Sequence, residues 1–136
     1  MRTFSISGGK GGVGKTTLTI NLAFAFAHMG NRVLLFDADL GLANIDVLLQ
    51  LKIKRTIQDV IAGRAHLADV LVKVSPQIDL IPSASGIQKL AQLSIYEVQE
   101  IIQQFSELPG TYPILLVDTA AGITEQVLQF TQAAQQ

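Results

Sequence analysis

Apolar residues along the chain fall into four short runs, and stretches with helical spacing of apolar positions lie between these runs. Short continuous apolar runs are typical of strands that are buried on both faces, as in a parallel sheet. We therefore expect four strands, at Thr3–Ser7, Arg32–Asp37, Ile78–Pro82 and Ile114–Asp118. Because strand and helix alternate, the pattern predicts an α/β fold of three layers with right-handed crossovers.

The helices expected between these strands begin and end at local signals. The first covers Lys15–Met29 and ends at Gly30, and its two apolar stripes predict packing on more than one side. A later helix begins at Ser94 with a capping box and stops at Pro109 and Gly110. Shorter helices are expected at Ala43–Leu49 and from Thr56 to Gly63, and a last one over the tail from Gln126 to Gln136. Four phenylalanines at helical spacing are expected in the core, namely Phe24, Phe26, Phe105 and Phe130.

The composition fits one globular domain, and we take residues 1–136 as a single, partial domain. With 49% apolar and 15% charged residues, the chain has enough material for a core, which excludes disorder. The formal net charge of −1 provides no overall basic field to hold nucleic acid or an anionic membrane. The absence of cysteine excludes a disulfide framework and a thiolate metal site. The start of the chain lacks the pattern of a signal peptide, so we expect a cytoplasmic location.

A glycine-rich loop between the first strand and the first helix contains two overlapping motifs. Gly9, Gly11 and Gly14 satisfy G-x-G-x-x-G, and Asp37, 23 residues after Gly14, suits the ribose-binding acid of a dinucleotide fold. The other frame, G-x-x-x-x-G-K-T, is a complete P-loop, and a dinucleotide site has no use for its Lys-Thr pair. We therefore favour the P-loop. Its backbone N–H groups are expected to bind phosphate, and the residues concerned are Gly9, Lys10, Gly11, Gly12, Val13, Gly14, Lys15, Thr16 and Thr17.

Within the P-loop, Lys15 is placed to reach the β- and γ-phosphates of a nucleoside triphosphate, and the Thr16 hydroxyl is placed to ligate Mg²⁺. A metal–triphosphate site also needs carboxylates at the carboxyl ends of neighbouring parallel strands. Asp118 ends an apolar run as a Walker B acid does, and Asp37 and Asp39 end the second strand. The alternative for each of these acids is a cap of the following loop. We expect Thr16, Asp37 and Asp118 to form the metal site.

Lys10 is a lysine in addition to Lys15, and an ordinary P-loop has no role for it. With Lys10 included, the stretch from Lys10 to Thr16 resembles the deviant Walker A motif of the MinD/ParA ATPases. The segments that follow Asp37 and Asp118 resemble the two switches of that family. The resemblance implies ATP and Mg²⁺ as ligands. It further implies that Lys10 reaches the partner's phosphates across an ATP-dependent homodimer, and that Asp39 orients the attacking water. Lys10, Lys15 and Asp39 are therefore the expected catalytic residues.

Segments between the nucleotide motifs resemble the MinD-like regulators of flagellar number and placement. They include Ile81–Gly86, Phe105–Pro109 and the residues that follow Asp37 and Asp118. This resemblance implies a partner in the flagellar assembly or transcription machinery and no direct contact with nucleic acid. A MinD-like regulator of the cell-division site or a ParA-like partition ATPase stays open as an alternative.

The chain departs from the resembling family in length, because it stops one helix after Asp118 where relatives continue with further strands. We therefore expect a truncated P-loop fold in which Thr3–Ser7 forms an uncovered edge strand that promotes self-association. Membrane contact is expected only if a C-terminal amphipathic helix exists in a longer protein, which would then be peripheral at the inner membrane face. The choice of purine rests on the resemblance alone.

Three functions follow from these residues. The first is a switch that hydrolyses ATP slowly, since the sequence has groups for phosphate, metal and water but no acceptor site. The second is a nucleotide-binding module without hydrolysis, and the third is an NAD-dependent oxidoreductase. The only basic cluster, Lys52-Ile53-Lys54-Arg55, is either a solvated turn or a contact with a partner protein or nucleic acid.

Overall fold

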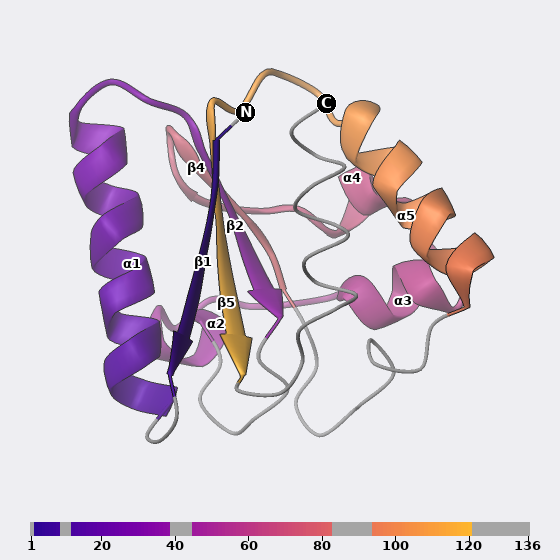
Figure 1. Cartoon of the computed structure of the whole chain (residues 1–136), viewed down its shortest axis with the longest axis horizontal. Helices are drawn as coiled ribbons and strands as arrows, with labels where there is room; N and C mark the ends of the chain where they lie inside the picture. The colour runs from indigo at the N-terminus through magenta and orange to yellow at the C-terminus, as the bar shows by residue number, and fades with distance from the viewer. Residues whose placement is uncertain (1, 9–11, 39–44, 83–93, 121–136) are drawn as a thin grey trace.

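The computed structural model describes residues 2–8, 12–38, 45–82 and 94–120. In these residues it contains a five-stranded sheet with the strand order β1-β5-β2-β4-β3, shown in Figure 1. The strands are β1 (Arg2–Gly8), β2 (Val33–Ala38), β3 (Val72–Ser75), β4 (Ile78–Ile81) and β5 (Ile114–Ala120). All neighbours pair in parallel except β3, which pairs antiparallel with β4. The four expected strands are confirmed, and β1 lies at an edge as predicted.

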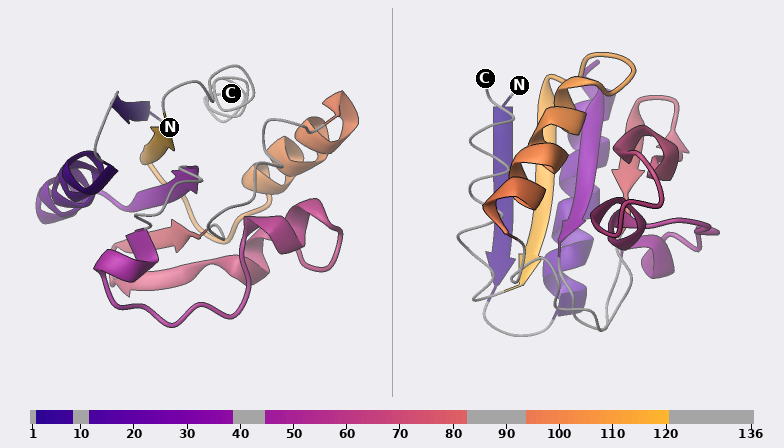
Figure 2. Two further views of the ribbon diagram at one scale, coloured as in Figure 1. Left: turned by 90° about the horizontal axis from the view of Figure 1, so that it is seen from below. Right: turned by 90° about the vertical axis from the view of Figure 1, so that its right-hand side faces the viewer.

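Helices cover both faces of the sheet, so the predicted three-layer α/β fold is confirmed (Figures 1 and 2). One face carries α1 (Gly12–His28) and α2 (Ile45–Leu48). The other face carries α3 (Ile57–Ile61), α4 (Leu67–Val70) and α5 (Ile95–Ser106). β3 and α4 were not predicted, because each has four residues and β3 has only two apolar positions. The expected tail helix lies outside the described residues.

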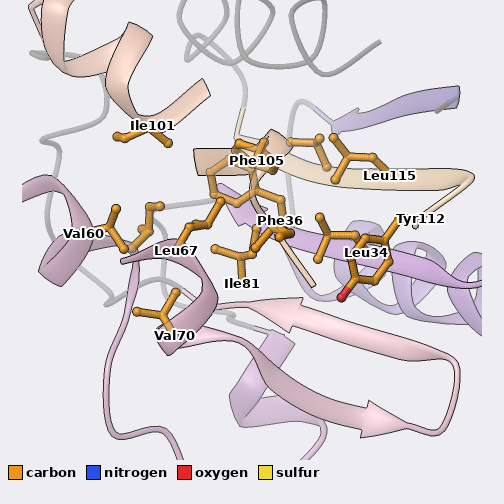
Figure 3. Packing of buried hydrophobic residues seen from close by; sticks show 13 residues of the cluster. Leu34, Phe36, Val60, Leu67, Val70, Ile81, Ile101, Phe105, Tyr112 and Leu115 are labelled. Atoms are coloured by element: carbon orange, nitrogen blue, oxygen red, sulfur yellow. The ribbon is translucent and has the colours of Figure 1, made fainter. Parts of the chain in front are cut away.

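Alternation along the central strands divides the core into two clusters. On β2, Leu34 and Phe36 face α3, α4 and α5, whereas Val33 and Leu35 face α1 and α2. The cluster on the α5 side, seen from close by in Figure 3, includes a tilted contact between Phe36 and Phe105 with ring centroids 6.0 Å apart. Burial of both faces explains why the central strands consist of continuous apolar runs.

Short-range capping bonds set the starts of two helices. The Ser94 hydroxyl accepts the N–H of Glu97 at 3.2 Å, and the Glu97 carboxylate accepts the N–H of Ser94 at 3.1 Å. Thr56 and Asp59 form the same reciprocal pair at the start of α3. The N–H of Thr56 and the guanidinium of Arg64 hold the pKa of Asp59 below its ordinary value. Residues three apart make these bonds, which is why the sequence predicted both starts.

The outer side of α1 differs from the prediction that it is packed on more than one side. Leu18 is 53% exposed and Phe24 is 43% exposed, so the expectation that Phe24 belongs to the core is wrong. Phe105 is buried as predicted, whereas Phe26 is half-buried and stacks on Phe4 at 5.5 Å. Phe130 lies outside the described residues. The physical reason is that α1 covers one face of the sheet, over β1, β5 and β2, so that its outer side has no further layer to pack against among the described residues (Figures 1 and 2).

Charged groups cluster at the amino ends of the parallel strands, around Asp79 of β4. This carboxylate is 5% exposed and accepts hydrogen bonds from Tyr112 at 2.5 Å and from Arg32 at 3.1 Å. Lys73 of β3 forms an ion pair with it at 3.0 Å, and the Arg32 guanidinium stacks 4.7 Å from the centre of the Tyr112 ring. Burial and the adjacent carboxylate raise the pKa of Tyr112 to about 12. The cluster joins β3 and β4 to the segments that lead into β2 and β5.

We expect Gly110→Ala to destabilise the fold more than Gly63→Ala does. Both glycines have positive φ, +94° and +78°, so alanine costs about 1–2 kcal/mol in backbone strain at either site. Only at Gly110 would the new Cβ overlap the Arg32 guanidinium, whereas the space beside Gly63 is open. Arg32 can move only by leaving Asp79 and Tyr112, which adds roughly 1 kcal/mol. Urea unfolding of both variants measures the difference, and equal losses would contradict a stabilising role of the Arg32 contacts.

Candidate functional site

The first turn of α1 lies beside the carboxyl end of β1, where the glycine-rich loop leads from strand to helix. In any α-helix the first four N–H groups have no partner within the helix, and they carry the positive end of the helix dipole. Gly12 and Val13 begin α1, and Gly14 is exposed, with open space at the position of a Cβ. Gly9, Lys10 and Gly11 lie outside the described residues. The beginning of α1 is therefore a helix terminus of the kind that binds anions.

The Asp118 carboxylate is the centre of the site. It is fully buried at the carboxyl end of β5 and forms an ion pair through Oδ1 with the ammonium of Lys15. Its other oxygen, Oδ2, accepts a hydrogen bond from the Thr16 hydroxyl at 2.9 Å. Thr16 is fully buried as well, and the Lys15 side chain is only 7% exposed. The sequence predicted that Lys15, Thr16 and Asp118 belong to one site. The tertiary fold brings these three side chains together, although Asp118 lies more than a hundred positions after the other two.

Strand register brings a second carboxylate to the same face. Asp37 of β2 pairs in register with Asp118 of the parallel strand β5, so the two residues are direct neighbours. Alternation from Val33 and Leu35, and from Ile114 and Leu116, puts both acids on the α1 face of the sheet. Asp37 is fully buried, and its Oδ2 accepts the N–H of Ile45 at 3.1 Å, at the start of α2. For Asp37, the alternative to metal binding was a cap of the following loop. The contact with the N–H of Ile45 is a capping contact of this kind.

The oxygen donors of this site suit magnesium. Mg²⁺ prefers hard oxygen ligands, keeps several waters, and binds proteins through one or two carboxylates together with substrate phosphates. Asp118 and Asp37 supply two buried carboxylates, and Thr16 supplies a hydroxyl. Within the part of the chain that the structure describes, no three His, Cys, Asp or Glu side chains are grouped to hold a metal ion. This donor set therefore fits Mg²⁺ whose coordination is completed by phosphate and water.

The remaining predicted residues have mixed outcomes. Thr17 is exposed on α1, beside the site but not part of the buried cluster. Asp39, like Lys10, lies outside the described residues, so their roles stay predictions. Thr19 was not predicted as part of this region; it is fully buried, and its hydroxyl donates a hydrogen bond to the carbonyl of Lys15 at 3.0 Å. Its position one helical turn after Lys15 was the available signal.

No helix within residues 12–38, 45–82 and 94–120 is long and apolar enough to cross a membrane.

Comparison with known proteins gives consistent relatives. Residues 1–129 match the family described as AAA domain. The antiactivator FleN of Pseudomonas aeruginosa is 49% identical over all 136 residues, which cover 100% of this chain and 49% of FleN. The flagellum site-determining protein YlxH of Helicobacter pylori is 37% identical over 133 residues, which cover 96% of this chain and 44% of YlxH.

A solved structure supports the same fold. The septum site-determining protein MinD of Pyrococcus horikoshii, complexed with Mg-ADP, superposes with a TM-score of 0.70 at 31% identity. The match covers 97% of this chain and 55% of the MinD chain. The five-stranded sheet and its helices therefore have the P-loop NTPase fold of MinD and ParA proteins. The chain spans about half the length of the relatives it matches.

We expect Thr16→Val to lower the free energy of unfolding by about 1.5–3 kcal/mol, because it removes a hydrogen bond to a buried charge at nearly constant side-chain volume. Thr17→Val is the matched control, since Thr17 is the next residue of α1 and is exposed. The control should change the stability by no more than about 0.5 kcal/mol. Urea unfolding without added nucleotide measures both variants. Equal stabilities of the two variants would show that the Thr16–Asp118 bond does not hold α1 to β5.

Proposed function

The chain belongs to the AAA domain family and is of the MinD/ParA type, and from that premise we propose that it is a Mg²⁺–ATP-binding switch that hydrolyses ATP slowly. The observation that carries the proposal is the buried cluster of Lys15, Thr16 and Asp118 at the carboxyl end of the parallel sheet. Open α/β sheets bind their ligands at this edge. The start of α1, which follows the glycine-rich loop in the sequence, meets the cluster there.

Lys15 and Asp118 exchange partners in the proposed complex. With nucleotide bound, the Lys15 ammonium, which is paired with Asp118 in the structure, would contact the β- and γ-phosphates, and Asp118 would be free to hold Mg²⁺ through its water shell. The Thr16 hydroxyl, which donates to Asp118, would be a metal ligand, and Asp37 would support the site from β2. Bound Mg²⁺ neutralises phosphate charge. The N–H groups over Gly9–Thr17 bind the phosphate oxygens.

Turnover and dimerisation depend on residues outside the described part of the chain. We propose that Asp39 orients the attacking water and that Lys10 reaches the nucleotide of a second copy in an ATP-dependent homodimer. The support is the match of Lys10–Thr16 to the deviant Walker A motif, together with the MinD/ParA type of the chain. We propose that hydrolysis resets the dimer, with water as the acceptor of the phosphoryl group.

The relatives support a flagellar role. One is named a flagellum site-determining protein, and the most extensive match described above is named an antiactivator. We propose that the whole protein regulates flagellar number or placement in the cytoplasm, through a protein partner in the flagellar assembly or transcription machinery. Regulation of the division site is the alternative, since a MinD protein has the same fold. Membrane association would require a segment beyond these 136 residues.

A binding module without hydrolysis is the second candidate, because the chain spans about half the length of its relatives. Release of inorganic phosphate from Mg²⁺–ATP distinguishes the two functions. Binding that does not depend on Mg²⁺ would instead favour the dinucleotide alternative.

We expect Lys15→Ala to reduce the affinity for a fluorescent ATP analogue at least a hundredfold in the presence of Mg²⁺, because the main fixed charge opposite the phosphates is lost. Lys52→Ala is the control, since it removes an exposed lysine outside the site and should change the affinity less than twofold. Fluorescence titration measures both variants. Unchanged affinity of Lys15→Ala would contradict the placement of the nucleotide.

Asp39→Ala should leave ATP binding intact and lower turnover by at least tenfold, because the attacking water loses the group that positions it. Glu100→Ala removes an exposed acid on α5 and should hydrolyse ATP at the wild-type rate. Phosphate release under saturating ATP measures turnover. Wild-type turnover in Asp39→Ala would refute the assigned role.

A further inference from the structure

A basic cleft lies beside β3, the edge strand next to β4. It has a volume of about 540 Å³ and is open to solvent, and its cationic lining residues are Lys52, Lys54, Arg55 and Lys73. The first three belong to the connection between α2 and α3, which runs along the outer side of the β3–β4 hairpin (Figure 2). The strand order puts this cleft at the opposite edge of the sheet from β1. Nothing in the proposed nucleotide site uses these residues.

The positive charge of the cleft is only partly compensated. Lys73 forms an ion pair with Asp79 at 3.0 Å, whereas Lys52, Lys54 and Arg55 are exposed and form no ion pair with any carboxylate of the described residues. The single acid among the lining residues is Asp69, whose Oδ2 accepts the N–H of His66 at 3.1 Å. With Lys73 paired to Asp79, the other three cations and the single lining acid Asp69 leave a local excess of positive charge on a chain whose net charge is −1.

A strand edge forms one wall of the same cleft. Val72 and Lys73 of β3 line it, and β3 pairs with β4 alone among the strands that the structure describes. An edge strand presents a row of N–H and C=O groups on its outer side, and extended peptides add to such edges by main-chain hydrogen bonds. Lys52, Lys54 and Arg55 of the α2–α3 connection line the same cleft, so the side chains of a strand added to β3 would be able to contact them.

We propose that this cleft binds an extended acidic segment of another protein, which adds as a strand to the outer edge of β3. The main chain of the segment pairs with β3, and its Asp or Glu side chains contact Lys52, Lys54 and Arg55. Nucleic acid fits less well, because the directed donors and acceptors of a strand edge match a peptide backbone and not a sugar–phosphate chain. The cleft also has only a few cations, which would neutralise only a few phosphates of a nucleic acid and so favour its binding little. The proposal is independent of nucleotide binding.

The test measures binding of a fluorescent eight-residue peptide of alternating Glu and Val to the 136-residue chain by fluorescence anisotropy without nucleotide. We expect saturable binding that weakens with salt, and at least fivefold weaker binding to the double variant Lys54→Gln/Arg55→Gln. The matched control is Arg2→Gln/Arg64→Gln, which removes the same charge at exposed positions outside the cleft and should change the affinity less than twofold.

Two further probes separate strand addition from other kinds of binding. The same peptide with alternate backbone nitrogens methylated keeps its charges but loses main-chain donors, and it should bind at least tenfold more weakly. Equal binding of the methylated peptide would overturn strand addition, and equal binding by the two double variants would overturn the cleft. Tighter, variant-sensitive binding of a single-stranded oligonucleotide would also overturn the proposal and assign the cleft to nucleic acid.

Discussion

The buried Asp118 carboxylate is the interaction on which the rest of the site depends. A carboxylate without solvent is stable only with charge and hydrogen-bond partners, and Lys15 and Thr16 supply both from the first turns of α1. The same contacts therefore fix the start of α1 against the end of β5 and orient the side chains that we propose bind phosphate and metal. Stability and the proposed ligand binding share these groups, so we expect changes at Lys15 or Thr16 to affect both.

Another buried carboxylate, that of Asp79, lies at the opposite end of the sheet, where the parallel strands begin. Asp79 joins β4 to β3 through Lys73, and to the segments before β2 and β5 through Arg32 and Tyr112. Continuous apolar runs lie between these two ends, where a charge would lack partners. The sheet is thus bounded at its amino ends by a structural polar cluster and at its carboxyl ends by the candidate nucleotide site.

The two edges of the sheet differ in what they expose. Near β1, exposed apolar side chains include Phe4, Leu18 and Phe24, whereas the β3 edge borders a basic cleft. The chain spans about half the length of its relatives. Apolar surface of this kind is typical of a protein contact, and the basic cleft is suited to acidic peptides. The two edges therefore present different surfaces for association.

Local rules determined what the sequence could predict. Continuous apolar runs identified four of the five strands, β1, β2, β4 and β5, and residues three apart identified the starts of α3 and α5. The glycine-rich loop with Lys15, Thr16 and Asp118 predicted the candidate site for phosphate and metal. Only the tertiary structure decided the strand order, the antiparallel β3, the exposure of Phe24 and the pairing of Lys15 with Asp118. Capping bonds and side-chain periodicity act within a few residues, so they can be recognised in sequence. Strand order and ion pairs join residues tens of positions apart, and they follow from the packing of the whole sheet.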